Sequence, residues 1–166
     1  MPVAWDTTTA ARLRPDSPAL DHARDRRQAG DPIAFTATTL KEISYGLHKA
    51  ATAGRQAASA QLRWLRDQIE AGLVEVLPFD DRAADLAGAL RAAIPTPPST
   101  LRRPRDRSKP DNRVAWILDI QIAATAFTHG YDLLTTDAHH TIIATRLTTL
   151  APTAPALRIH PPPRFP

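Results

Sequence analysis

The feature that most limits the fold of this chain is a series of short, unbroken apolar segments separated by longer helical ones. The apolar segments do not alternate with polar residues, which is typical of strands buried on both faces. They lie at 2–5, 32–36, 73–79, 132–136 and, as an expected edge strand, 156–160. Helices are expected at 7–13, 17–30, 38–50, 55–72, 80–94, 113–129 and 139–148. This order predicts an α/β fold whose central parallel sheet is flanked by helices on both faces.

The length of the chain suits one compact domain. We expect its 166 residues to form a domain over 1–160, with a flexible Pro-rich tail at 161–166. A basic, Pro-rich loop is expected at 95–112. No segment has the composition of a signal peptide or the length of a membrane span, and cysteine is absent. These features exclude disulfides and thiolate metal sites and predict a cytoplasmic protein that does not associate with membranes.

The basic charge of the chain is carried almost entirely by arginine. The net charge is +4, and all but three of the 21 basic residues are Arg. Because a planar guanidinium group donates two hydrogen bonds to one phosphate, an arginine-rich surface is typical of nucleic-acid binding. A GC-rich coding sequence, which favours Ala, Arg and Pro, explains the same composition equally well. Both interpretations stay open at this level.

Four acidic residues occupy positions that a parallel sheet would bring together. Such sheets bind ligands at the carboxyl ends of their strands, where each following helix also begins. Asp6 ends the first strand and Asp137 ends the fourth, while Glu42 lies in the first turns of the helix after the second. Asp119 lies about 9 Å along its own helix, at 1.5 Å per residue. We therefore expect all four carboxylates to reach the same edge of the sheet.

Asp119 is the most informative of the four because it lies on an apolar stripe. Its neighbours at helical spacing are Ala115, Trp116, Ile122 and Ala123. A buried carboxylate without a partner is costly, and no Lys or Arg lies between positions 114 and 145. A distant arginine is one possible partner. A divalent metal ion shared with the other acids is the second.

Local structure offers an alternative explanation for each of the other three acids. Asp6 and Asp137 suit helix N-caps, and the segment from Thr39 to Glu42 matches a capping box. The joint placement of the four is harder to explain locally, since four adjacent carboxylates repel one another. Oxygen ligands of this kind bind hard cations such as Mg²⁺ or Mn²⁺. This interpretation makes Asp6, Glu42, Asp119 and Asp137 the candidate metal ligands.

Four stretches resemble the PIN-domain ribonucleases, in particular the VapC-type toxins of bacterial toxin–antitoxin pairs. They are "VAWDTTTAARL", "IAFTATTLKEISYGLHKA", "EVLPFDDRAADLAGALRA" and "LDIQIAATAFTHGYDLLTTD", spread over most of residues 2–138. The resemblance implies a PIN-like three-layer sandwich with an acidic pocket that holds Mg²⁺ or Mn²⁺. It implies catalytic and metal-binding roles for the four acids and supporting roles for Thr7 and Thr135.

One part of the chain departs from the pattern of these ribonucleases. Many of them continue after the last acid with a further acid and an aromatic residue, as in D-x-D-F. Here the chain reads "DAHHTII", which places His139 and His140 there. We expect this histidine pair to face solvent, as adjacent histidines more often do. Contact of either ring with RNA or with the metal is the alternative.

The resemblance also implies an activity and partners. The expected activity is hydrolysis of RNA phosphodiester bonds by a metal-dependent endoribonuclease that leaves 5′-phosphate and 3′-hydroxyl ends. The expected partners are a structured RNA, such as a tRNA or rRNA, a cognate antitoxin protein and a second copy of the chain. The candidate residues for binding RNA phosphates are Arg12, Arg14, Arg102, Arg103, Arg105, Arg107 and Lys109. A solvated linker is an equally good explanation of the basic loop.

Other function classes fit the sequence less well. A dinucleotide-binding fold requires a Gly-rich turn after the first strand, and "DTTTAAR" contains no glycine. A P-loop nucleotidase is excluded because the chain lacks G-K-[ST]. The remaining rival is a PIN-like module that binds RNA or protein without cutting it. A complete set of four acids has no purpose in such a module, so the sequence favours the metal-dependent nuclease.

Overall fold

The computed structural model describes residues 2–97 and 109–163, and it describes side chains in 2–97 and 113–163. Five strands form one sheet in the order β3-β2-β1-β4-β5, and every pair is parallel. They are β1 Val3–Trp5, β2 Ile33–Thr36, β3 Val74–Leu77, β4 Asp132–Leu134 and β5 Ile159–His160. This sheet confirms the α/β class predicted from the apolar segments, although all five strands are shorter than those segments.

The helices lie between the strands as the sequence pattern predicts. They are α1 Thr7–Ala10, α2 Pro18–Gln28, α3 Ala37–Thr52, α4 Gln56–Glu70, α5 Asp81–Ala93, α6 Lys109–Thr128 and α7 Ala138–Leu150. Helix α2 begins as its sequence suggests, because the Ser17 side chain accepts the N–H of Leu20 and Pro18 occupies the first turn. Helix α6 begins at Lys109, four residues before the predicted start, so the basic loop is shorter than expected at its C-terminal end.

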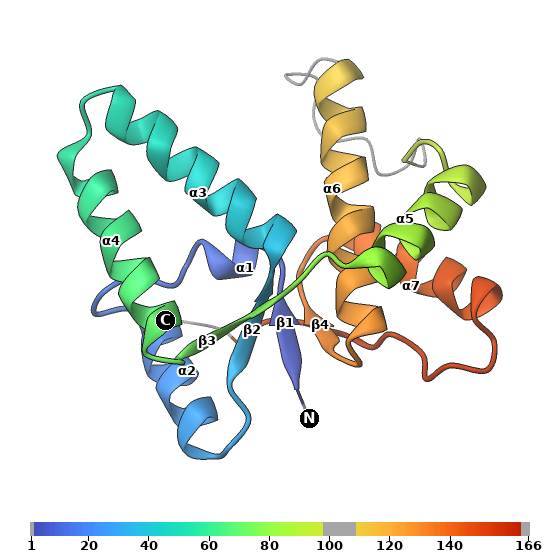
Figure 1. The fold of residues 1–166 in the computed structure, drawn as a ribbon, viewed down its shortest axis with the longest axis horizontal. Helices are drawn as coiled ribbons and strands as arrows, with labels where there is room; N and C mark the ends of the chain where they lie inside the picture. The colour runs from blue at the N-terminus through green and yellow to red at the C-terminus, as the bar shows by residue number, and fades with distance from the viewer. Residues whose placement is uncertain (1, 98–108, 164–166) are drawn as a thin grey trace.

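Side chains of the sheet alternate between two buried layers. Trp5 and Phe35 pack with helices α1, α2 and α4 on one face, whereas Ala4 and Ala34 pack with α5, α6 and α7 on the other. Figure 1 shows the two groups of helices on opposite sides of the strands. Since Phe35 is fully buried, its removal from water contributes about 1.5–3 kcal/mol. The result is the three-layer sandwich that the resemblance to PIN-domain ribonucleases implies.

The strand order places a switch point at the centre of the sheet. From β1 the chain moves outward through β2 to β3, and then crosses through α5 and α6 to β4 on the other side of β1. The chain therefore leaves β1 towards the helices on one face of the sheet and leaves β4 towards α7 on the other face. At the point where they separate, the Asp6 N–H donates to the Leu134 carbonyl at 3.2 Å. Ligands of open α/β sheets bind at this kind of position, beyond the carboxyl ends of the strands.

Some predictions about organisation fall partly outside the described residues. Positions 98–108 of the predicted basic loop do so, and therefore the loop remains a prediction there. The domain boundary at 160 and the flexible tail also remain predictions. Within the described ranges, no helix combines the length and the apolar character needed to cross a membrane.

Candidate active site

The four predicted acidic residues line one cavity at the carboxyl edge of the sheet. The cavity has a volume of about 210 Å³. Its lining comprises Asp6, Thr7, Thr8, Glu42, Ala115, Asp119, Ile122, Asp137 and His140. The structure thus brings together side chains from four separate segments of the chain. Among the described residues that line it, none is a lysine or an arginine.

Asp6 is held by hydrogen bonds on both carboxylate oxygens. It is the N-cap of α1, and its Oδ1 accepts the N–H of Thr9 at 2.7 Å. Its Oδ2 accepts the hydroxyl of Thr135 at 2.6 Å. Asp6 is only 3% exposed, so these bonds compensate the loss of water around a charged group. The N-cap explanation of Asp6 is therefore correct, and the same side chain also lines the cavity.

Glu42 has a different local role from the one its capping-box pattern suggests. The N-cap of α3 is Thr36, whose hydroxyl accepts the N–H of Thr39 at 3.0 Å. Because the helix begins three residues earlier than a box at Thr39 requires, Glu42 does not cap it, and that interpretation is wrong. Instead Glu42 Oε2 accepts the hydroxyl of Thr7 at 2.5 Å. This bond crosses from α1 to α3 and directs Glu42 to the cavity.

Asp137 lies three residues beyond the end of β4 and caps α7. Its Oδ1 accepts the backbone N–H of His139 at 3.0 Å. Its own N–H donates to the Thr135 hydroxyl at 2.9 Å. Thr135 therefore joins Asp6 and Asp137 through one oxygen, donating to the first and accepting from the second. The supporting role that the resemblance implies for Thr135 remains a prediction, with which these two hydrogen bonds agree.

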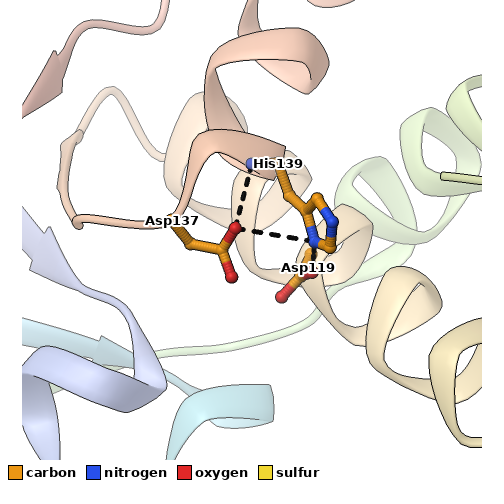
Figure 2. Close-up of side chains that lie close together, drawn as sticks. All are labelled: Asp119, Asp137 and His139. Carbon is orange, nitrogen blue, oxygen red and sulfur yellow. Dashed lines mark hydrogen bonds and ion pairs between the residues drawn. The ribbon is translucent and has the colours of Figure 1, made fainter. Parts of the chain in front are cut away.

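Asp119 is buried, as its apolar neighbours predict, and its partners are histidines. Its side chain comes from α6, where Trp116, Ile122 and Ala123 are also buried. Asp119 Oδ2 lies 2.8 Å from His139 Nδ1, and its Oδ1 lies 3.9 Å from His140 Nε2. Figure 2 shows dashed lines from His139 Nδ1 to the carboxylates of both Asp119 and Asp137. No distant arginine is needed to explain the buried charge.

The expectation that His139 and His140 face solvent is wrong. Their exposed fractions are 5% and 1%, because the first turn of α7 packs against α6. The His139 ring meets Trp116 edge to face, with ring centroids 5.3 Å apart. One signal in the sequence could have predicted this burial. Asp137 suits an N-cap, so His139, two positions later, lies in the first turn of the helix and therefore close to the sheet edge. Thr9, whose N–H holds Asp6, was likewise not predicted from the sequence.

His140 lies beside the acids in a water-poor environment. Burial is the largest influence on the pKa of His140 and lowers it below the ordinary 6.5, although Asp119, Asp6 and Asp137 act in the opposite direction. Among the described residues, none offers a hydrogen-bond partner to its buried Nδ1. The lowered pKa favours a neutral imidazole, which does not cancel the negative charge of the cavity.

The predicted phosphate-binding residues lie away from the cavity lining or outside the described part of the chain. Arg12 and Arg14 are exposed beyond α1 and do not line the cavity. Lys109 is the first residue of α6, and its side chain is not described. The other candidates, Arg102, Arg103, Arg105 and Arg107, lie outside the described residues.

The donor set of the cavity fits a hard divalent cation. Four carboxylates offer oxygen ligands, and a cation within the cavity would relieve their mutual repulsion. Among the described residues, one possible ligand atom each of Asp119, Asp137 and His139 lie within 4.8 Å of one another, and neither Asp6 nor Glu42 belongs to this group. The chemistry of the residues therefore agrees with the Mg²⁺ or Mn²⁺ predicted from the sequence.

The family model of the PIN domain matches residues 4–145. The chain belongs to the PIN-domain family. The match confirms the resemblance drawn from the four sequence stretches, and it includes all four acids of the cavity. Among the curated proteins, none matches the chain significantly.

Solved structures of VapBC toxin–antitoxin systems share the PIN fold of this chain. A chain of the DNA-bound VapBC structure from Salmonella typhimurium is 20% identical with a TM-score of 0.59, covering 97% of this chain and 98% of that one. VapBC-1 from nontypeable Haemophilus influenzae gives 16% identity, a TM-score of 0.60 and the same coverages. VapBC-5 from Mycobacterium tuberculosis gives 23% identity and a TM-score of 0.52, and the match covers 98% of this chain and 100% of that one. At these identities the likeness establishes the fold.

Proposed function

We propose that this PIN-domain protein is a metal-dependent endoribonuclease that hydrolyses RNA phosphodiester bonds and acts as the toxin of a toxin–antitoxin pair. The observation that supports it most strongly is the convergence of four carboxylates on one cavity at the switch point of the sheet. A module that only binds RNA or protein has no need for this costly concentration of negative charge.

The proposed ligands of Mg²⁺ or Mn²⁺ are Asp6, Glu42, Asp119 and Asp137. When bound, the ion would lower the pKa of a water molecule and offset negative charge that develops on the phosphate. The protein keeps the acids in place before the ion arrives. Thr135 and the N–H of Thr9 fix the orientation of Asp6, and Thr7 fixes Glu42. Because these donors belong to short helices and strand ends, the carboxylates need little reorganisation on binding.

RNA binding in this proposal depends on arginine contacts with phosphate groups around the cavity. Arg12 and Arg14 are exposed and follow α1, whose first residues line the cavity. They are therefore suitable to contact phosphates that flank the scissile bond. Arg102, Arg103, Arg105, Arg107 and Lys109 are further candidates from the sequence. Sequence-specific recognition of RNA usually involves unpaired loops, so we propose a structured RNA such as a tRNA or rRNA as the substrate.

The proposed protein partners are a cognate antitoxin and a second copy of the chain. The relatives of known structure named above are toxin–antitoxin systems, which supports an antitoxin partner for a chain with the same fold. An acidic cavity that cleaves cellular RNA requires inhibition during normal growth. An antitoxin that covers the cavity supplies that inhibition.

Cleavage of total tRNA by antitoxin-free protein tests the proposed activity. The reaction is run with Mg²⁺, with Mn²⁺ and with EDTA, using the wild type, Asp119→Asn and the matched variant Asp85→Asn, whose carboxylate is exposed on α5. Discrete cuts are expected in the wild type and in Asp85→Asn when metal is present. They should disappear with EDTA and in Asp119→Asn. Absence of cuts in tRNA and rRNA alike, with no stabilisation by Mn²⁺, would favour the module that binds without cutting.

A further inference from the structure

An exposed tyrosine lies on α3 one helical turn beyond Glu42. This residue, Tyr45, is 67% exposed, the largest fraction among the large apolar side chains that the structure describes. Residues three apart share a helix face, so Tyr45 lies on the same face as Glu42, which lines the cavity. Long helical side chains lean towards the N-terminus of their helix, and α3 begins at the carboxyl edge of the sheet. This preference directs the Tyr45 ring towards the cavity.

The surface beside the Tyr45 ring is open. Gly46 is the next residue, and nothing lies within 4 Å of the position that a Cβ of Gly46 would occupy. Glycine is unfavourable in the interior of a helix, so helix stability does not explain its presence here. The opposite side of α3 is the packed one, where Leu40 and Ile43 contact the core. Within the described ranges, no side chain therefore prevents a flat group from approaching the ring.

A second exposed apolar side chain lies on the helix across the cavity. Helices α3 and α6 approach each other where the Thr38 hydroxyl donates to Gln121 at 3.4 Å. Val114 precedes Gln121 by seven residues, about two turns, so it lies on the same face of α6, and it is 56% exposed. Figure 1 shows α3 and α6 separating from each other beyond the sheet. Two of the three exposed large apolar side chains of the described residues thus flank the acidic cavity.

Two lysines place positive charge on both sides of Tyr45. Lys41 and Lys49 lie four residues before and after it, so the three side chains share one helix face over about 12 Å at 1.5 Å per residue. Both lysines are exposed, and neither forms an ion pair with a described residue. Aromatic rings among cations are typical of sites for single-stranded nucleic acid, where the ring stacks on a base and the cations follow the phosphates.

We propose that Tyr45 stacks on an unpaired base next to the phosphate in the cavity, while Lys41 and Lys49 contact phosphates on either side of that base. The inference rests on the proposed function, because it takes RNA as the substrate of the cavity. A base inside a duplex cannot offer its face to the ring, so the RNA must be single-stranded there. Since stacking tolerates every base, Tyr45 selects unpaired RNA over paired RNA rather than one base over another.

Binding of a short fluorescent single-stranded RNA, followed by anisotropy in EDTA, tests this role without cleavage. The variants are Tyr45→Leu, which removes the ring, Tyr45→Phe, which keeps it, and Lys49→Gln. The matched controls are Leu150→Ala, which truncates the third exposed large apolar side chain, and Arg66→Gln, which removes an exposed charge on α4. Each titration is repeated at several salt concentrations and with an RNA duplex of the same length. A strand that carries 4-thiouridine is then photo-cross-linked to the wild type, and mass spectrometry identifies the attached peptide.

The expected results separate stacking from charge and from a general surface effect. Tyr45→Leu should bind the single strand about 5-fold to 150-fold more weakly, with the same salt dependence as the wild type. Tyr45→Phe should bind like the wild type, because stacking uses the ring and not the hydroxyl. Lys49→Gln should lower the slope of log affinity against log salt by about 0.7, the value for one phosphate contact with a single strand. The controls should change neither quantity, the duplex should be insensitive to Tyr45→Leu, and 4-thiouridine should attach to the peptide that contains Tyr45.

Several results would overturn the inference. One is an equal affinity of Tyr45→Leu and the wild type for the single strand, and another is a set of cross-links that all map outside α3. The cross-links are measured on the wild type, so they do not depend on the folding of a variant. Loss of antitoxin binding in Tyr45→Leu, with RNA binding unchanged, would make this face of α3 a protein interface instead.

Failure of the inference can be distinguished from failure of the proposed function. If RNA binds through Tyr45 but is not cut with Mg²⁺ or Mn²⁺, the nuclease function fails and the inference stands. If RNA is cut in the presence of metal and Tyr45→Leu binds it like the wild type, only the inference fails. If the wild type binds no single-stranded RNA, either in EDTA or with Mn²⁺, both fail.

Discussion

Replacing Thr135 by valine removes the hydroxyl that joins two acids of the cavity. Thr135 is 3% exposed. Its oxygen donates to Asp6 at 2.6 Å and accepts the N–H of Asp137 at 2.9 Å. Valine has nearly the same shape but neither donates nor accepts hydrogen bonds. The substitution therefore leaves the backbone conformation in place and removes only the two polar contacts.

The size of the effect follows from these two bonds. A hydrogen bond to a charged group contributes about 1.5–3 kcal/mol, and loss of the acceptor for the partly buried N–H adds about 1 kcal/mol. We expect a total loss of about 3 kcal/mol in the free energy of unfolding without metal. For a chain of this size that corresponds to a melting temperature lower by about 6–12 °C. Metal affinity should fall as well, because Asp6 loses one of its two fixed oxygens.

Thermal and urea unfolding of metal-free protein measure this loss. The matched control is Thr145→Val, which removes an exposed hydroxyl that bonds only to the preceding turn of α7. The control should stay within about 0.5 kcal/mol of the wild type. A loss for Thr135→Val no larger than that of the control would refute the reasoning. It would mean that the bond to Asp6 contributes nothing to the arrangement of the acids.

Three further predictions concern the metal, one tyrosine and two glycines. Mn²⁺ at about 100 times its dissociation constant should stabilise the wild type by about 2.7 kcal/mol, and most of this should be lost in Asp119→Asn, as thermal unfolding will show. Burial and the hydrogen bond to Glu75 raise the pKa of Tyr131 from 10.0 to about 12. The contribution of this shift to the free energy of unfolding is complete below pH 10 and is lost as the pH rises towards 12. Between these pH values the free energy of unfolding of the wild type should therefore fall more steeply than that of Tyr131→Phe. Ultraviolet titration should show that the variant lacks the ionisation near pH 12. Gly130→Ala should destabilise by about 1 kcal/mol, because Gly130 follows α6 with φ of 74°, whereas Gly46→Ala in the exposed interior of α3 should stabilise by about 0.5–1 kcal/mol, both measured by urea unfolding.

The arrangement of strands and acids was largely predictable because it depends on local patterns. Apolar segments without alternation indicate strands buried on both faces, and the parallel sheet then determines which ends share an edge. Asp6 follows β1 directly and Asp137 lies three residues beyond β4, so their positions near the sheet edge needed no knowledge of the packing. Asp119 was predicted to be buried from its apolar neighbours alone. The roles of these acids in catalysis remain predictions.

The environment of the histidines depends on contacts that the local sequence does not determine. His139 follows Asp119 by twenty positions, and the pair meets only because α6 and α7 cross at the sheet edge. The capping box at Glu42 failed for a related reason, since Thr36 at the end of β2 provides an earlier N-cap. The start of α6 was predicted four residues too late. The Pro-rich, basic sequence before position 113 suggested a loop, but a proline such as Pro110 is tolerated in the first turn of a helix, and α6 begins at Lys109.

Analysis of the ends produced by RNA cleavage in ¹⁸O-labelled water tests the central claim most directly. If the acidic cavity uses a divalent ion to activate water, the products will carry 5′-phosphate groups that contain one ¹⁸O atom and 3′-hydroxyl ends. EDTA will abolish them, as will Asp119→Asn. Products that end in 2′,3′-cyclic phosphate, or unlabelled products that form equally well in EDTA, would contradict the account. They would show that the four carboxylates do not serve metal-assisted hydrolysis.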